Sequence, residues 1–268
     1  EVKTRKKNLL LFMTYTHIQS PLEQFEINSL MGINAPLFGY AQLSLTNIGL
    51  YFILALIVVV GFNVIANNNN QIIANKYSIS QESLYTTILN MVQAQIASPK
   101  GQLYFPFIYC LFMLVLAGNF IGMVPYSFAI TSHLIFTLSV SMTILIAVTI
   151  IGFQEHGLKF FSYFVPAGTP LALVPLLVLI ELISYIAKGL SLGIRLGANI
   201  MAGHMLTKII GGFIYQIMAA SPLMFVIGII PLVLLVAITG LELAIAFIQA
   251  YVFAILTCSY IKDSLDLH

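Results

Sequence analysis

The stretch from Glu181 to Leu206 reads ELISYIAKGLSLGIRLGANIMAGHML and decides the fold class. It is mostly apolar, yet it carries Lys188 and Arg195 inside a run that no proline interrupts between Leu176 and Ser221. Residues 171–210 therefore predict one helix about 60 Å long. Because the hydrocarbon core of a membrane is only ~30 Å thick, such a helix must tilt steeply, bend or break.

The composition of the whole chain agrees with a membrane location. Of its 268 residues, 60% are hydrophobic and only 7% are charged, whereas a soluble domain has ~25% charged residues. This excludes a soluble enzyme, a disordered chain and, with a net charge of only +2, a nucleic-acid binder. Cys110 and Cys258 lie in apolar runs and indicate buried thiols. Without nucleotide, haem or metal motifs, we expect no cofactor and no metal.

The apolar runs and the charges between them predict an all-α polytopic membrane protein. We expect a leader or propeptide over residues 1–19 and a single membrane domain over 20–268. Within that domain, runs of ~20 apolar residues mark the spans. The expected parts are a first transmembrane helix at 43–66, an amphipathic surface helix at 80–98, a transmembrane hairpin at 104–153, and two long tilted helices within 170–262.

One face of the first long helix is polar. Five polar residues follow one another at spacings of 3, 4, 3 and 4, which places them on one side of a helix. They are Glu181, Ser184, Lys188, Ser191 and Arg195. The opposite side carries Gly189, Gly193 and Gly197, two overlapping G-x-x-x-G units that favour close helix packing. The last helix, expected over 232–261, has a shorter stripe of Thr239, Glu242, Ala246 and Gln249.

Arg195 is the residue that most needs an explanation. An arginine at membrane depth costs ~2.5–3.5 kcal/mol on insertion scales. One alternative is a buried ion pair with Glu181 or Glu242. The other is a fixed positive charge that faces a bound or moving anion, a role that suits arginine because it does not release its proton.

The remaining polar residues also have two interpretations. Glu181 and Glu242 are neutral core acids or proton carriers, and His204 is a core histidine or a partner in proton relay. The amides Asn199 and Gln249 either pack helices or line a polar path. Lys188 and Lys208 are expected to extend toward headgroups or water.

Several long motifs resemble one family. Residues 181–206, LELAIAFIQAYVFAIL at 241–256 and GNFIGMVPYSFAITSHL at 118–134 resemble subunit a of F-type ATP synthases, and SPLEQFEI at 20–27 resembles the start of its mitochondrial, budding-yeast form. The likeness extends over residues 20–266.

The resemblance implies a function and a role for each residue. The family is a proton-translocating stator that couples proton flow through two offset half-channels to rotor rotation and ATP synthesis. It has no catalytic centre of its own. Arg195 corresponds to its stator charge, Glu181 to the outlet half-channel, His204 and Glu242 to the inlet half-channel, and Asn199 and Gln249 to polar positions near the arginine.

The same resemblance implies partners and a location. The expected partners are the ring of c subunits, subunit b, small accessory membrane subunits and membrane lipid, with a dimeric complex possible. The expected location is the mitochondrial inner membrane, crossed several times.

Two other classes of membrane protein are compatible with polar residues at depth. A secondary transporter would show inverted repeats, and we find no convincing repeat here. A purely structural anchor would not carry five ionisable residues at depth. The position of Arg195 separates a transporter from a stator, because only a stator leaves this charge on a face that another protein covers.

Overall fold

The computed structural model describes residues 21–37, 41–67, 75–96, 101–124, 127–165 and 173–265. The leader expected over residues 1–19 lies outside this set. Chain contacts divide the molecule into two units. Unit 1 holds Gly203–Gly240 and the described residues before Ile27, and unit 2 holds Ile27–Ala202 with Leu241–His268. The single domain expected over 20–268 stays a prediction.

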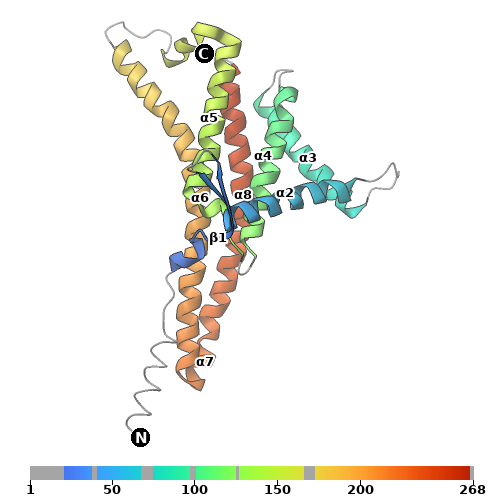
Figure 1. Cartoon of the computed structure of the whole chain (residues 1–268), viewed down its shortest axis with the longest axis vertical. Helices are drawn as coiled ribbons and strands as arrows, with labels where there is room; N and C mark the ends of the chain where they lie inside the picture. Colours follow the sequence, from blue (N-terminus) through green and yellow to red (C-terminus); the bar gives the residue numbers. More distant parts are fainter. Residues whose placement is uncertain are drawn as a thin grey trace. The chain divides into compact units, whose positions relative to one another are not determined.

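Helices make up most of the described chain (Figure 1). Five helical segments in it are long and apolar enough to cross a membrane, so the all-α polytopic class is confirmed. The elements in chain order are η1 (Pro21–Phe25), β1 (Ser29–Leu37), β2 (Ala41–Thr46), α2 (Asn47–Ala66), α3 (Lys76–Gln95), α4 (Gly101–Gly122), η2 (Ile130–Ser132), α5 (Leu134–His156), η3 (Gly157–Phe164), α6 (Val174–Ala220), α7 (Pro222–Ile227) and α8 (Ile229–Leu265).

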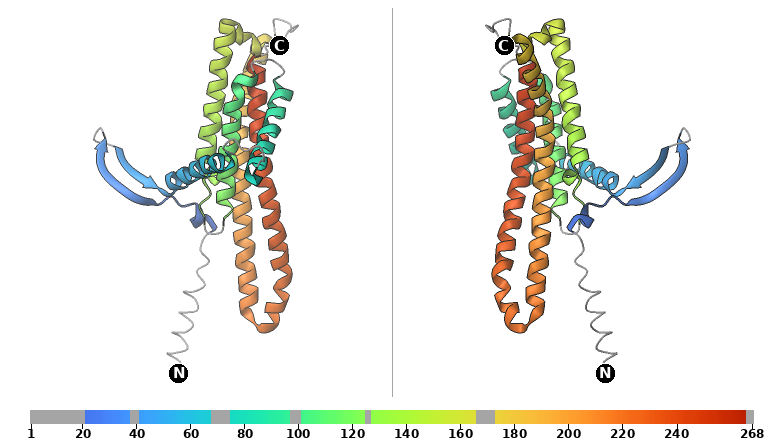
Figure 2. Two further views of the ribbon diagram at one scale, coloured as in Figure 1. Left: turned by 90° about the vertical axis from the view of Figure 1, so that its right-hand side faces the viewer. Right: turned by 90° about the vertical axis from the view of Figure 1, so that its left-hand side faces the viewer.

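A β-hairpin before the first membrane helix was not expected from the sequence. Strands β1 and β2 pair antiparallel, with Gly32 opposite Ser44 and Ser29 opposite Thr46, and they project away from the helices of unit 2 (Figure 2). Helix α2 therefore begins at Asn47, four residues after the predicted start. Hydropathy cannot place this boundary, because residues 43–46 are as compatible with a strand as with a helix.

The amphipathic helix is displaced slightly toward the N-terminus, to Lys76–Gln95. Its buried residues Ile88, Met91 and Val92 recur at helical spacing and pack in one cluster with Ile108 and Phe112 of α4. Its polar side is not entirely solvated, because the Gln81 side chain donates a hydrogen bond to the side-chain oxygen of Asn63 in α2. Helix α3 is thus attached to both α2 and α4.

The glycine face of α6 lies against α5. A Cβ atom at Gly193 would lie 2.8 Å from the carbonyl oxygen of Thr137 and 2.9 Å from Cα of Leu138. Gly189 faces Leu145 of α5, and Gly197 faces Leu134 of α5. Because the nearest atoms at Gly193 include backbone, only glycine lets the two helices approach this closely.

The two long helices are much longer than a simple span. Helix α6 contains 47 residues and α8 contains 37, whereas ~20 suffice to cross a membrane. Helix α2 has 20 residues and crosses the direction of α8 instead of running along it (Figures 1 and 2). A 20-residue helix must stand nearly upright to span ~30 Å. This crossing favours the expected steep tilt of α8, which stays a prediction.

Small residues allow α6 and α8 to pack tightly. Ala246, Ala250 and Ala254 of α8 are each fully buried and recur every four residues, which makes a smooth ridge on one side of the helix. Leu192 and Leu196 of α6 belong to the same buried cluster as Ala250 and Ala254. This packing sets which faces of the two helices remain available.

Candidate functional site

Arg195 lies on the exposed side of α6. Its neighbours Leu192 and Leu196 are buried, and Gly193 faces α5, so the packed sides of the helix are occupied and the arginine points elsewhere. Among the described residues Arg195 forms no ion pair. The alternative of a buried pair with Glu181 or Glu242 is therefore not what the structure shows.

Two of the predicted residues flank Arg195 along α6. Asn199, one turn further on, is also exposed, whereas Glu181 is partly buried near the start of the helix. From Glu181 to Arg195 the stripe extends about 21 Å at 1.5 Å per residue. The structure thus presents a carboxylate, an arginine and an amide along one accessible side of a membrane helix.

The stripe of α8 points inward from Glu242 onward, whereas Thr239 is exposed. Glu242 is only 5% exposed and Ala246 is fully buried, while Gln249 is partly buried. Ala246 packs with Ile200 of α6, and its carbonyl oxygen accepts a hydrogen bond of 2.9 Å from Nδ2 of Asn119. Asn119 is itself fully buried in α4. This bond fixes α8 against α4 one turn from Glu242, and nothing in the local sequence pattern indicated it.

His204 lies in unit 1 and is partly buried, whereas Glu242 lies in unit 2. The predicted inlet pair thus has one member in each of two units that are described separately. It therefore stays a prediction.

A second cation of the stripe has a partner within the chain. The Nζ atom of Lys188 donates a hydrogen bond of 3.0 Å to the hydroxyl of Tyr163 in η3 and lies 3.5 Å from a carboxylate oxygen of Asp263 in α8. The hydroxyl of Tyr260 in α8 donates to the backbone carbonyl of Lys188 at 3.3 Å. We call Lys188, Tyr163, Asp263 and Tyr260 the lysine cluster. The expectation that Lys188 extends toward headgroups or water stays a prediction, because 34% of its side chain is exposed beside these partners.

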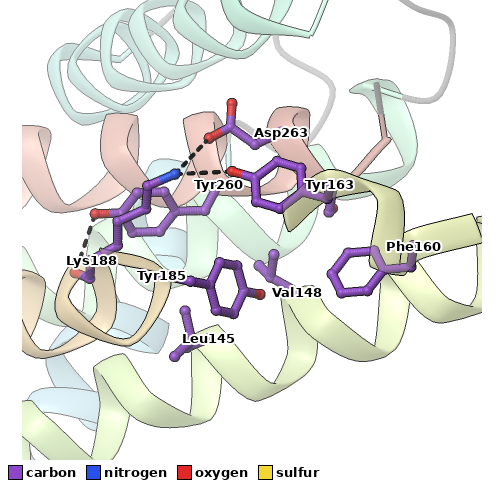
Figure 3. A pocket seen from close by; sticks show the side chains of 9 residues that line it. Leu145, Val148, Phe160, Tyr163, Tyr185, Lys188, Tyr260 and Asp263 are labelled. Carbon is purple, nitrogen blue, oxygen red and sulfur yellow. Dashed lines mark hydrogen bonds and ion pairs between the residues drawn. The ribbon is translucent and has the colours of Figure 1, made fainter. Parts of the chain in front are cut away.

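The lysine cluster borders a small cavity (Figure 3). Polar side chains form one part of its wall, and apolar side chains from α5 and η3 form the other. The hydroxyl of Tyr185, one turn after Glu181 on α6, points into this cavity. Sequence reasoning missed the cavity, because its residues come from four segments that are far apart in the chain.

These features define a class of protein. It is a multi-pass, all-α membrane protein in which two long apolar helices carry ionisable residues. One of these residues is an accessible arginine without an ion pair in the described part of the chain. In the described residues no three potential ligands gather into a metal site.

Comparison with known proteins identifies the family. The family described as the ATP synthase A chain matches residues 49–262. ATP synthase subunit a of Emericella nidulans is 58% identical over 254 residues, covering 95% of this chain and 99% of the relative. The subunits a of Neurospora crassa and Kluyveromyces lactis are 55% and 53% identical, each covering 94% of this chain and 96% or 98% of the relative.

The chain therefore belongs to the ATP synthase A chain family. Members of this family are the proton-translocating chain of the membrane sector, and the function expected from the sequence is confirmed at this level. The chain is one part of a larger complex that transports protons.

Proposed function

We propose that Arg195 is the fixed charge that meets the carboxylates of a rotating ring of c subunits. The observation that carries this proposal is its accessible position on α6 with no ion pair among the described residues. An uncompensated arginine at membrane depth is costly. A partner that brings a carboxylate to this face removes that cost, and it does so only while the complex is assembled.

The acidic, imidazole and amide side chains near Arg195 supply the proton paths on either side of it. A proton enters near His204 and Glu242 and neutralises a carboxylate of the ring, which can then move through lipid. After rotation of the ring, a protonated carboxylate reaches Arg195 and loses its proton there, because the arginine stabilises the ionised form. The released proton departs past Glu181, while Asn199 and Gln249 provide polar surface near the arginine. The partly buried state of Glu181 and the burial of Glu242 are compatible with these roles.

Arg195 also separates the two paths. Its positive charge repels a proton that would cross directly from the inlet side to the outlet side. Each charge that crosses a potential of 100 mV carries ~2.3 kcal/mol, so a direct leak would dissipate the energy used for ATP synthesis. Arginine suits this barrier because it keeps its proton.

The remaining partners and the location follow from the same family resemblance. We propose that subunit b, small accessory membrane subunits and lipid contact the other apolar faces, and that the complex resides in the mitochondrial inner membrane, as a dimer in some states. Many large apolar side chains of α2 are exposed, among them Ile57 at 63% and Val64 at 68%. Such a surface requires lipid or partner proteins around it.

The proposal is tested by Arg195→Ala in the assembled ATP synthase, with Ser191→Ala as the matched control. Ser191 lies one turn away on the same exposed side. We expect proton-driven ATP synthesis to fall by about a hundredfold or more in the arginine variant, the size seen when one preorganised charge or donor is removed from a reaction site. The serine variant should stay near the unsubstituted protein. Assembly is measured for both. Retained synthesis in Arg195→Ala would contradict the proposal.

A further inference from the structure

The chain reverses its direction directly after α5. This helix ends in three polar residues, Gln154, Glu155 and His156, which mark where it leaves the apolar region of the membrane. Gly157 follows with a positive φ of 55°, a conformation that residues with a side chain rarely adopt. Helix η3 begins at this turn. The turn therefore decides where η3 lies relative to the membrane surface.

Helix η3 folds back along the last apolar turn of α5. Phe160 is buried against Gly152, where a Cβ atom would lie only 2.6 Å from Cδ2 of the phenylalanine ring. The ring centre of Phe160 is 4.8 Å from that of Phe153, and Phe161 packs edge-on against Phe153 with ring centres 5.6 Å apart. Because Gly152 and Phe153 both precede the polar end of α5, η3 lies beside the membrane-crossing helix and does not continue away from it.

The outer side of η3 combines an apolar edge with a cation. A 3₁₀ helix has three residues per turn, so residues i and i+3 share an edge. Leu158 and Phe161 share one edge and are 84% and 57% exposed. Lys159 begins the neighbouring edge, and its side chain is exposed too. Helix η3 thus presents apolar side chains and a lysine next to each other at the level where α5 meets the membrane surface.

The charge of Lys159 is not compensated within the described part of the chain, where its side chain forms no ion pair or hydrogen bond. Asp263 of α8, which borders the same cavity as Phe160, is already bound by Lys188. A lysine next to apolar side chains keeps its stem on the apolar surface and extends its ammonium group into the polar layer. The complementary ligand has an anionic head and apolar chains.

We propose that η3 is an interfacial binding site for one anionic phospholipid. Lys159 binds the phosphate of the headgroup, and Leu158 and Phe161 contact the acyl chains. The lysine selects anionic over neutral lipid, and the apolar edge sets the depth of the contact. A neutral lipid would satisfy only the apolar edge, and a free phosphate only the lysine. The site uses edges of η3 that do not carry Tyr163, and it does not depend on the role proposed for Arg195.

The binding test uses the assembled ATP synthase in vesicles of phosphatidylcholine with about one-fifth phosphatidylglycerol. A trace of phosphatidylglycerol with a photoactivatable acyl chain labels the protein on illumination, and mass spectrometry locates and counts the adducts per assembled chain. We expect adducts on η3 at about five times the level given by a phosphatidylcholine probe with the same acyl chain. Equal labelling by the two probes would overturn the selection of an anionic headgroup. If neither probe labels η3, for example because another subunit covers it, the site itself is overturned.

The role of the cation is tested by Lys159→Gln, with Lys76→Gln as the matched control. Lys76 is an exposed lysine at the start of α3. We expect phosphatidylglycerol adducts on η3 to fall about fivefold in Lys159→Gln, the effect of one lysine near an anionic surface. They should stay unchanged in Lys76→Gln and in Lys159→Arg, which keeps the charge. Equal labelling in all of these variants would overturn the contact between Lys159 and the headgroup.

Excess inorganic phosphate separates a lipid phosphate from a free one. We expect the adducts on η3 to be the same in phosphate and in chloride of equal ionic strength. Loss of adducts in phosphate alone would mean that Lys159 binds a free anion, and it would overturn the lipid site. The test of Arg195→Ala is independent, because retained ATP synthesis in that variant would remove the proposed function and leave the lipid site standing.

Discussion

Two cations on the same side of α6 have opposite environments. Lys188 is bound by Tyr163 and Asp263 of its own chain, whereas Arg195, two turns further on, is exposed and forms no ion pair in the described residues. A charge that is compensated within the chain contributes to holding helices together. A charge that the chain leaves uncompensated in a membrane points to an anion supplied by another molecule.

The largest expected difference between the two sites comes from exchanging the type of cation. We predict that Arg195→Lys lowers proton-driven ATP synthesis about tenfold or more, because lysine can lose its proton and cannot form two parallel hydrogen bonds to a carboxylate. Lys188→Arg keeps a permanent charge between Tyr163 and Asp263 and should change synthesis by less than about threefold. The two variants are assayed side by side at equal amounts of assembled complex. Equal losses would remove the distinction between the two cations.

The second expected effect concerns the packing of Gly193 against α5, which directs the Arg195 side of α6 away from the other helices. Gly193→Ala places a Cβ atom 2.8 Å from the carbonyl oxygen of Thr137, and such overpacking costs typically ~1–3 kcal/mol. We expect the amount of assembled chain to fall several-fold. Gly61→Ala in α2 is the matched control, because a Cβ there meets no atom within 4 Å. Quantitative immunoblots of membranes compare the two, and equal amounts would show that α5 and α6 do not depend on this contact.

A smaller effect is expected from the compensated pair itself. The side chains of Lys188 and Asp263 are 34% and 35% exposed, so the coupling between them should be only about 0.5–1 kcal/mol after solvent screening. A double-mutant cycle with Lys188→Met and Asp263→Asn in micelles measures this coupling. The free energy of unfolding should fall by less in the double variant than the sum of the decreases in the two single variants. Strict additivity would mean that the pair contributes nothing.

The smallest effect is a pH dependence outside the membrane spans. Burial lowers the pKa of His133, which stacks on Phe128 just before α5, with ring centres 4.9 Å apart. The unfolded chain then binds more protons than the fold below the ordinary pKa of ~6.5, so stability decreases as the pH falls through that value and levels off below the lowered pKa. Thermal scans of the purified chain in micelles at several pH values should show this slope, and His133→Gln should remove it. A slope of the opposite sign would mean that the fold favours the charged form.

Periodicity and charge placement predict most of the membrane helices and the two sides of α6. The spacing of Gly189, Gly193 and Gly197 depends only on residues close together in the chain, so the packed side of α6 was predictable. The family motifs likewise depend on the sequence alone. Boundaries were less accurate: α6 was expected over residues 171–210 and extends over Val174–Ala220, because an apolar run contains no signal for where a helix ends.

The features that sequence reasoning missed all depend on long-range contacts. Lys188 resembles any lysine near a membrane surface until Asp263 and Tyr163 are placed beside it. Asn119 resembles a turn residue of the GNFIG motif until its bond to Ala246 is seen. The β-hairpin was missed because the same apolar residues fit a strand and the start of α2 equally well.

The central claim is that another protein supplies the anion for Arg195, and the most direct measurement is a structure of the assembled membrane sector. The account predicts a carboxylate of a ring subunit within ~4 Å of the Arg195 guanidinium in at least one rotational state. A guanidinium paired in every state with Glu181 or Glu242 of its own chain would contradict it.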